Sequence, residues 1–281
     1  MTNFQPFDSA QDRSPISNLE YPTSSSPAFA PQLPRPARIA QIIPENDRTR
    51  TFILDASVDA TPGQFIMAWL PGFDEKPFSL ANDDPVTITV ARAGPFTTLL
   101  HERQAGDRLW FRGPFGCGFE IAGQRLLLVG GGYGVAPLGF LARRALGHGC
   151  QITVAVGART ATDLLLVQHF AEMGVNLRLT TEDGSAGRQG LVTDAVEPLL
   201  VAGEIDSLYA CGPHGMLEAL DRLCREQGVP AQLSWEAYIR CGIGLCGSCE
   251  QNGLLLCVDG PVLAGGACRT FPSMLQSAAT Q

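Results

Sequence analysis

The chain has 281 residues and a formal net charge of −8 at pH 7, with 45% hydrophobic and 17% charged residues. The acidic balance argues against nucleic acid as a partner, since phosphate binding requires basic patches. No stretch reaches the roughly 18 consecutive apolar residues of a membrane span, and no secretory signal is visible. Nine cysteines is an odd count, so we expect reduced cysteines in a cytoplasmic protein without disulfides.

The first part of the chain predicts a tail and then a barrel. Residues 1–33 are rich in Ser, Pro, Gln and Asp without periodicity, which predicts a disordered extension. Residues 34–122 contain short β-branched and aromatic runs bounded by Pro, Gly or Asp, which predict an antiparallel β-barrel. Thr97 and Thr98 predict the start of a helix over 99–104. The predicted strands cover 37–45, 49–56, 63–71, 85–93 and 106–114.

Residues 123–235 alternate between strands and helices, which predicts a doubly wound parallel α/β sheet. Residues 236–281 form a small third domain that holds a cysteine-rich loop and two short apolar runs. The fold class is therefore multidomain: barrel, α/β sheet and cysteine loop. The predicted strands cover 125–134, 151–159, 175–183, 207–213 and 231–236, and the predicted helices 136–149, 162–174 and 214–228.

The cysteine loop carries the most specific signal in the sequence. Cys241, Cys246 and Cys249 have the C-x4-C-x2-C spacing of plant-type [2Fe-2S] sites, and Cys257 follows. Gly242, Gly244 and Gly247 allow the loop to turn tightly around the sulfurs. A structural zinc is the alternative, because C-x2-C is a common zinc spacing. Three ligands within nine residues favour the cluster over zinc, and such a cluster carries one electron at a time.

Two further motifs indicate a dinucleotide site. Gly130–Pro137 (GGGYGVAP) follows a predicted strand and opens a helix, so its backbone N–H groups can receive a pyrophosphate. A tight turn without a ligand is the alternative, since Val135 stands where a third glycine or alanine is usual. Cys211–Pro213 ends a strand at the sheet edge where ligands bind. Cys211 faces a nicotinamide or packs in the core. The predicted dinucleotide contacts are Gly131, Gly132, Gly134, Gly212 and Pro213.

A third group of residues lies in the predicted barrel. Lys76–Ser79 places a cation, an aromatic ring and a hydroxyl on one strand, where they are suited to a phosphate, an isoalloxazine ring and its N5 atom. Thr89–Ala91 and Phe96–Thr98 follow. The helix start at Thr97 and Thr98 offers a further phosphate contact. Each piece alone is ordinary strand or cap chemistry, and their order along the chain gives them weight.

Taken in order, these motifs resemble the ferredoxin–NADP reductase superfamily. The run CGIGLCGSC with the later CVDGPV narrows the resemblance to the electron-transfer subunits of class 1B dihydroorotate dehydrogenases, over about residues 36–265. That family implies FAD, a [2Fe-2S] cluster and NAD(H). It also implies a heterotetramer in pyrimidine biosynthesis, in which a separate FMN-containing subunit oxidises dihydroorotate to orotate. Electrons then pass through the cluster and FAD to NAD+.

The resemblance also implies roles for residues. Ser79 would hydrogen-bond flavin N5 and act with Cys211 as a catalytic residue, and Cys257 within CVDGPV is preferred over Cys268 as fourth cluster ligand. NAD is preferred over NADP, although Arg159 could meet a 2′-phosphate. The flavin would be lined by Lys76, Pro77, Phe78, Ser79, Thr89, Val90 and Ala91, with Phe96, Thr97 and Thr98 near its phosphates.

The sequence departs from the family at several positions, which keeps rival functions open. Lys76 replaces an arginine, Phe78 a tyrosine or aliphatic residue and Phe96 a glycine, and the gap from Cys249 to Cys257 is short. One rival is a reductase subunit for a hydrogenase, sulfite reductase or oxygenase. Another is a non-enzymatic redox- or metal-sensing protein without flavin.

No His, Asp and Ser set indicates a hydrolytic centre. His101 and His169 lie on predicted helices as surface or capping residues, and we expect His214 to be solvent-exposed. The cysteines outside the motifs are expected to pack in the core. They are Cys117, Cys150 and Cys224.

Overall fold

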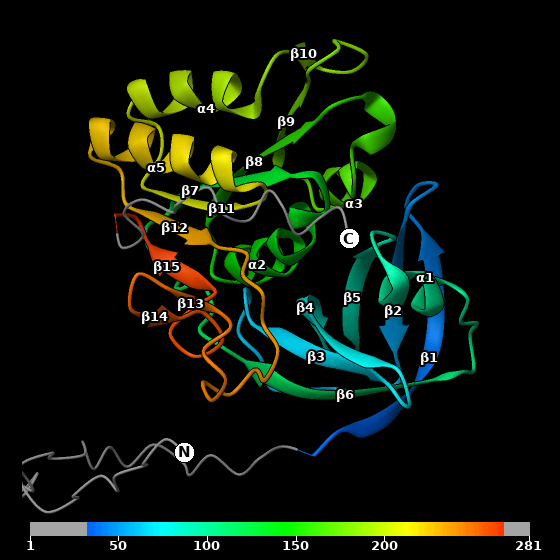
Figure 1. Cartoon of the computed structure of the whole chain (residues 1–281). Helices are drawn as coiled ribbons and strands as arrows, with labels where there is room; N and C mark the ends of the chain where they lie inside the picture. Colours follow the sequence, from blue (N-terminus) through cyan, green and yellow to red (C-terminus); the bar gives the residue numbers. More distant parts are fainter. Residues whose placement is uncertain (1–32, 267–281) are drawn as a thin grey trace, which may run out of the picture. The chain divides into compact units, whose positions relative to one another are not determined.

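A computed structural model describes residues 33–266 of the chain (Figure 1). The predicted extension of residues 1–33 lies outside this range except for its last residue, and Cys268 also lies outside it. The expectations for those residues therefore stay predictions.

The first half of the described chain forms a closed six-stranded barrel with strand order β1-β2-β5-β4-β3-β6, in which all neighbours are antiparallel. Burial alternates along β5, as expected for a strand with one face in the barrel core: Val86, Ile88 and Val90 are buried, while Thr87 and Thr89 are half-buried. The predicted barrel is confirmed. Its strands are β1 (Arg35–Pro44), β2 (Thr49–Leu54), β3 (Phe65–Leu70), β4 (Asp74–Asp83), β5 (Val86–Ala91) and β6 (Arg108–Phe115).

The helix in the barrel domain begins earlier than predicted. It is α1 (Pro95–His101), whereas the sequence placed a helix over 99–104. Pro95 occupies the first turn, where its missing N–H costs nothing. The Thr97 hydroxyl accepts hydrogen bonds from the backbone N–H of Ala93 and of Gly94, at 2.9 and 3.0 Å. Thr97 therefore stabilises the helix start from inside the first turn.

The second half forms a seven-stranded sheet with strand order β10-β9-β8-β7-β11-β12-β15. All pairs are parallel except β12 with β15, which is antiparallel. The predicted parallel sheet is thus confirmed, and the last strand comes from the cysteine-rich segment. The strands are β7 (Arg125–Gly131), β8 (Gln151–Ala158), β9 (Asn176–Thr181), β10 (Arg188–Gln189), β11 (Ser207–Cys211), β12 (Ala231–Ser234) and β15 (Val262–Ala264). A separate hairpin pairs β13 (Glu250–Gln251) with β14 (Leu254–Leu255).

Helices cover both faces of this sheet (Figure 1). Leu126 and Leu128 of β7 pack in one apolar cluster with α2 and α3, whereas Leu127 and Val129 pack in the other with α4 and α5. Successive strand residues point to opposite faces, so one apolar run serves both layers. The helices are α2 (Ala136–Gly147), α3 (Val167–Glu172), α4 (Val192–Val201) and α5 (His214–Gln227), with the short 3-10 turns η1 (Gly132–Val135) and η2 (Ala161–Asp163).

The helix predicted over 162–174 is wrong in its first half. η2 and the short α3 are separated by a non-helical segment in which Leu166 has φ 58°. The turn η2 is bound to the barrel: Asn46 Nδ2 donates to Thr162 O at 3.1 Å, and Arg48 pairs with Asp163 at 3.0 Å. Tertiary contacts here override helix propensity.

Helix α4 was not predicted at all, because Pro198 lies inside it and a glycine-rich run precedes it. Two further expectations were wrong. His101 is buried, with Nε2 2.9 Å from Val90 O, rather than at the surface. Cys117 is exposed, whereas Cys150 and Cys224 are buried as expected.

Helix α2 ties the sheet to the barrel. Arg143 Nη2 donates to Ala81 O at 2.7 Å and to Asn82 Oδ1 at 2.9 Å, and Arg144 forms an ion pair with Asp83. All three partners lie on β4, so the proposed flavin strand is braced against the sheet domain. Within residues 33–266, no helix is both long and apolar enough to cross a membrane.

Candidate functional site

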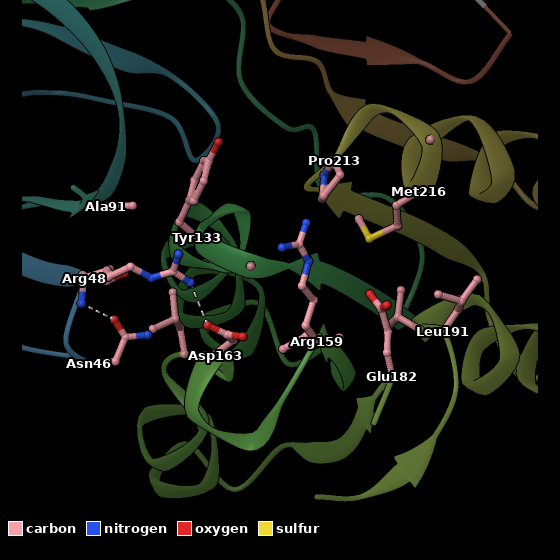
Figure 2. A pocket seen from close by; sticks show the side chains of 18 of the residues that line it. Asn46, Arg48, Ala91, Tyr133, Arg159, Asp163, Glu182, Leu191, Pro213 and Met216 are labelled. Carbon is pink, nitrogen blue, oxygen red and sulfur yellow. Dashed lines mark hydrogen bonds and ion pairs between the residues drawn. The ribbon is translucent and has the colours of Figure 1, made fainter. Parts of the chain in front are cut away.

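A cavity of about 610 Å³ lies at the carboxyl edge of the parallel sheet, next to the barrel (Figure 2). Of the predicted dinucleotide residues, Gly131, Gly132 and Pro213 line it. Of the predicted flavin residues, Ala91 lines it, at the end of β5. Ligands of open α/β sheets bind at this edge. The cavity therefore lies where a dinucleotide would join the two domains.

The glycine turn and the Cys-Gly-Pro turn meet in this cavity although about 80 residues separate them. β7 and β11 are neighbours, with Gly130 opposite Cys211. A Cβ on Gly134 would lie 2.7 Å from Cys211 O, and one on Gly212 would lie 3.0 Å from Gly131 N. Only glycine allows this approach, which leaves backbone rather than side chain at the cavity wall.

Charged side chains surround the cavity (Figure 2). Arg48 and Asp163 pair at 3.0 Å across the junction of barrel and sheet. Arg159 follows β8 and Glu182 follows β9, and both line the cavity. Sequence reasoning found Arg159 but missed Arg48 and Glu182. The signal that could have found Glu182 was its position at the carboxyl end of the strand predicted over 175–183.

Tyr133, Cys211 and Glu236 form a second group beside the cavity. The Tyr133 hydroxyl hydrogen-bonds the Glu236 carboxylate, and desolvation followed by the Glu236 charge raises the pKa of Tyr133 to about 12. Desolvation also raises the pKa of Glu236, against the lowering effect of the Tyr133 hydrogen bond. Although Glu236 as a whole residue is exposed, its carboxyl group is crowded by these neighbours. Sequence reasoning missed both Tyr133 and Glu236.

Cys211 is buried, which raises the pKa of its thiol to about 12. The thiol is therefore protonated at neutral pH and is no nucleophile. His214, expected to be exposed, is half-buried with its ring centroid 4.9 Å from that of Trp235. His214 Nδ1 also lies 3.5 Å from Glu218 Oε1.

The predicted flavin strand is β4. Lys76 Nζ pairs with Asp74 at 2.7 Å, which lowers the pKa of Asp74, and lies 5.9 Å from the Tyr238 ring centroid. The rings of Phe78 and Phe96 are 5.9 Å apart. Phe96 is buried in the barrel core, whereas Pro77, Phe78 and Ser79 are half-buried.

The other residues predicted to bind the flavin lie in different environments. Thr89 Oγ1 lies 2.8 Å from Thr51 Oγ1. The carbonyl oxygen of the buried Val90 lies 2.9 Å from His101 Nε2. Thr97 uses its hydroxyl at the helix start, and Thr98 is exposed. The structure thus places these residues on β4, β5 and α1, which are adjacent elements, and brings only Ala91 to the cavity.

The cysteine loop is organised around its sulfurs. The backbone N–H groups of Ile243, Leu245 and Cys246 point at Cys241 Sγ, at 3.5, 3.3 and 3.4 Å. Two further N–H···S bonds are made, from Gly244 to Cys257 Sγ at 3.1 Å and from Cys257 to Cys249 Sγ at 3.4 Å. Such bonds stabilise thiolates and tune iron–sulfur centres.

The four cysteines differ in environment. Hydrogen bonding with Ser248 lowers the pKa of the exposed Cys246 to about 6. Burial, with Cys249 next in importance, raises the pKa of Cys257 to about 12, and Cys241 also acts on Cys257. These interactions link Cys246 to Cys241, and Cys257 to both Cys249 and Cys241. Gly242, Gly244 and Gly247 all have φ near +70° (73°, 73° and 70°), as the predicted tight loop requires.

The donor set suits a two-iron cluster. Within residues 33–266, no three His, Cys, Asp or Glu side chains are grouped as a single metal ion would require. A [2Fe-2S] cluster has a different requirement, because its four thiolates are shared between two irons. The five N–H···S bonds supply the backbone donors that such clusters use.

Comparison with known proteins agrees with the fold. Residues 128–222 match the family described as "Oxidoreductase NAD-binding domain". A solved NADH-dependent reduced ferredoxin-NADP oxidoreductase has a TM-score of 0.75 and 32% identity, covering 82% of this chain and 88% of that one. A ferredoxin reductase of carbazole 1,9a-dioxygenase shares the fold, with a TM-score of 0.62, 21% identity and coverage of 72% and 68%. The fold and site thus define an NAD-binding oxidoreductase.

Two relatives narrow this class. Both are named "Probable dihydroorotate dehydrogenase B (NAD(+)), electron transfer subunit". The protein from Thermococcus kodakarensis is 46% identical over 77% of this chain and 90% of its own length. The one from Methanocaldococcus jannaschii is 40% identical over 81% and 88%. The chain belongs to the family of dihydroorotate dehydrogenase B electron transfer subunits, which confirms the resemblance drawn from the motifs.

Proposed function

We propose that this chain carries electrons between a partner dehydrogenase and NAD+, with FAD and a [2Fe-2S] cluster as its cofactors. The single observation that supports this most is the cysteine loop, whose four sulfurs and five N–H···S bonds lie on the same molecule as a dinucleotide cavity. A hydride carrier and a one-electron centre on one chain require a cofactor that can exchange both, and a flavin supplies that chemistry.

The dinucleotide would bind at the glycine turn. Gly131, Gly132 and Gly134 with Gly212 and Pro213 offer a wall of backbone that a pyrophosphate can approach. Arg48 and Arg159 lie at the same cavity and bring positive charge to it, and Glu182 brings a negative one. A carboxylate beside the cavity favours NAD over NADP, because it repels a 2′-phosphate and can accept a hydrogen bond from a 2′-hydroxyl.

The flavin would lie along β4, β5 and the start of α1. Lys76 supplies the only cation of the predicted set, and it pairs with Asp74 at 2.7 Å. Ser79 supplies a hydroxyl donor for flavin N5, and the protonated Cys211 thiol would face the nicotinamide. Ala91 at the cavity wall connects this strand pair to the dinucleotide site. These residues would bind and orient the two rings.

Tyr133 and Glu236 would control protons and water near the same rings. Tyr133 stays protonated at neutral pH and holds the Glu236 carboxylate by a hydrogen bond. Because its pKa is raised by its surroundings, the Glu236 carboxyl would hold a proton to higher pH than an ordinary glutamate, which suits a group that exchanges protons at a site.

The cluster would be held by Cys241, Cys246, Cys249 and Cys257. Leu245 and Cys246 are exposed, so one side of the loop faces outward, while Cys249 and Cys257 are buried. An exposed cluster edge gives a partner access for single-electron exchange. The partner would be an FMN-containing catalytic subunit that oxidises dihydroorotate, consistent with the names of the relatives.

Co-expression with that catalytic subunit tests the proposal. We expect the two chains to purify together and to reduce NAD+ with dihydroorotate anaerobically. The catalytic subunit alone should reduce a dye but not NAD+. Failure of the purified pair to reduce NAD+, with both flavins and iron present, would contradict the proposed partner.

A second candidate is a reductase for a protein electron carrier such as ferredoxin. The 32% identity to an NADH-dependent reduced ferredoxin-NADP oxidoreductase favours it. It predicts NADH-dependent reduction of ferredoxin by this chain, without any dihydroorotate-oxidising subunit. Comparing the two reactions on one preparation separates the candidates.

A further inference from the structure

One arginine of the barrel joins the cysteine loop to the proposed flavin strand. Arg112, on β6, donates through Nε and Nη2 to the two carboxylate oxygens of Glu75, at 2.7 and 2.6 Å. The same Nη2 donates to the backbone carbonyl of Cys241 at 2.7 Å. Cys241 is the first cysteine of the loop, and Glu75 directly precedes Lys76 on β4. A single guanidinium therefore connects the two regions.

The arginine is held firmly. Its side chain is 13% exposed and that of Glu75 is 21% exposed. The Phe115 ring lies under the guanidinium, with its centroid 5.2 Å from Cζ. Bidentate contact with a carboxylate fixes the plane of the guanidinium, and the third hydrogen bond then has a set direction. Lysine has three donors but no planar fork, so it cannot reproduce the bidentate contact with Glu75.

The loop also touches the barrel directly at this point. Gly242 follows Cys241, has φ +73° and approaches Met67 of β3 so closely that a Cβ would lie 3.1 Å from its Cγ. Cys241 itself packs against the apolar cluster that contains Phe65 and Met67. Two independent contacts, one polar and one by packing, thus seat the start of the loop on the barrel.

We propose that Arg112 is a positioning residue, which fixes the Cys241 end of the cluster loop relative to the flavin strand and sets the electrostatic environment of the cluster. Arg112 and Glu75 neutralise each other beside Cys241. Loss of the arginine alone would leave the Glu75 carboxylate there without its partner, and added negative charge lowers the reduction potential of an iron–sulfur centre. This inference rests on the proposed function, since it assumes that the loop holds a cluster.

The test compares three variants with the wild-type chain. Arg112→Gln removes the charge and the fork, Arg112→Lys keeps only the charge, and Glu75→Gln keeps the arginine but loses the ion pair. Arg125→Gln is the control. Arg125, on β7, also forms an ion pair with a carboxylate, that of Asp206. Each protein is purified anaerobically and assayed for iron, acid-labile sulfide and flavin.

Three measurements then separate positioning from a general structural effect. The first is the rate of iron release to a chelator, which we expect to rise about tenfold in Arg112→Gln, as for loss of an outer-shell partner. The second is the cluster midpoint potential, expected to fall in Arg112→Gln and to rise in Glu75→Gln. The third is flavin reduction by NADH, expected to stay within about twofold of wild type.

Arg112→Lys should have a cluster midpoint potential close to that of wild type, because it keeps the positive charge. It should release iron faster, because it lacks the planar fork. If all three variants match Arg125→Gln in iron release and potential, the inference is overturned. If Arg112→Gln does not fold, Arg112→Lys and Glu75→Gln carry the same test. A wild-type chain without iron and sulfide would instead overturn the proposed function.

Discussion

Gly134, which follows the cavity-lining Tyr133, lies against Cys211: a Cβ on Gly134 would come within 2.7 Å of Cys211 O. The contact joins the two turns that follow β7 and β11. Because Gly130 and Cys211 are register partners in the sheet, the turns are held at a fixed separation by the strands beneath them. The close approach of the two turns therefore depends on the absence of a side chain at residue 134.

Gly134→Ala should weaken NADH binding. The added methyl group has to displace the backbone of Cys211, so we expect the KM for NADH to rise about tenfold or more while flavin content is retained. Steady-state NADH-to-dye kinetics measure this. Gly147→Ala is the control, since a Cβ at this last residue of α2 would have no neighbouring atom within 4 Å. Equal KM values for the two variants would contradict the assigned role of the turn.

Cys249→Ser should remove the cluster and spare the flavin. Cys249 is buried in the loop and accepts a hydrogen bond from Cys257 N, so its loss leaves the irons without a complete ligand set. We expect iron and sulfide to fall while NADH-to-dye activity remains. Cys117→Ser, at an exposed cysteine, should keep full iron content. Joint loss of flavin and cluster in Cys249→Ser would argue against independent sites.

Ser79→Ala should slow flavin reduction with little effect on folding. Loss of one hydrogen bond to a reacting ring costs about tenfold in rate. Anaerobic stopped-flow reduction by NADH measures it. Thr87→Ala on the neighbouring strand removes a hydroxyl that donates to Pro85 O and should leave the rate unchanged. An unaltered rate in Ser79→Ala would remove Ser79 from the proposed mechanism.

Glu236 should make stability depend on pH. Its pKa in the folded chain is raised above the usual 4.5, so the folded state holds the proton to higher pH than the unfolded state. Stability is therefore lost as pH rises above about 4.5 through the folded pKa. Glu236→Gln removes this loss. We expect the difference in urea midpoint, variant minus wild type, to be larger at about pH 8 than at about pH 4. Glu197→Gln, at an exposed position of α4, is the control. A relative midpoint that does not change with pH would contradict the raised pKa.

Glu182 should contribute to coenzyme choice. Glu182→Gln removes a negative charge from the cavity that also contains Arg159, so we expect the preference for NADH over NADPH to fall about tenfold. The ratio of kcat/KM values for the two coenzymes measures it. Arg159→Gln should change the ratio in the opposite direction. A ratio unchanged by Glu182→Gln would place the adenosine ribose elsewhere.

Local sequence signals predicted the parts of the site that depend on short-range spacing. The cysteine loop could be found from C-x4-C-x2-C, and the structure adds the N–H···S bonds that its glycines permit. The glycine turn and Cys211 could be found because strand ends carry ligands in parallel sheets. In each case the residues that determine the feature lie close together along the chain.

Residues paired across the fold could not be predicted in this way. Nothing near Arg112 indicates that its partners are Glu75 and Cys241, which lie 37 and 129 residues away. Tyr133 and Glu236 likewise meet only after the sheet has formed. The segment before α3 was predicted as helix because its leucines favour one, but its hydrogen bonds to the barrel determine its structure.

The most direct test of the proposed electron-transfer function is an anaerobic visible spectrum of the purified chain before and after NADH, with iron, sulfide and flavin assays on the same sample. We expect flavin bands over a broad iron–sulfur absorbance, both bleached by NADH. A colourless protein that contains zinc would contradict it and make the cysteine loop a structural metal site.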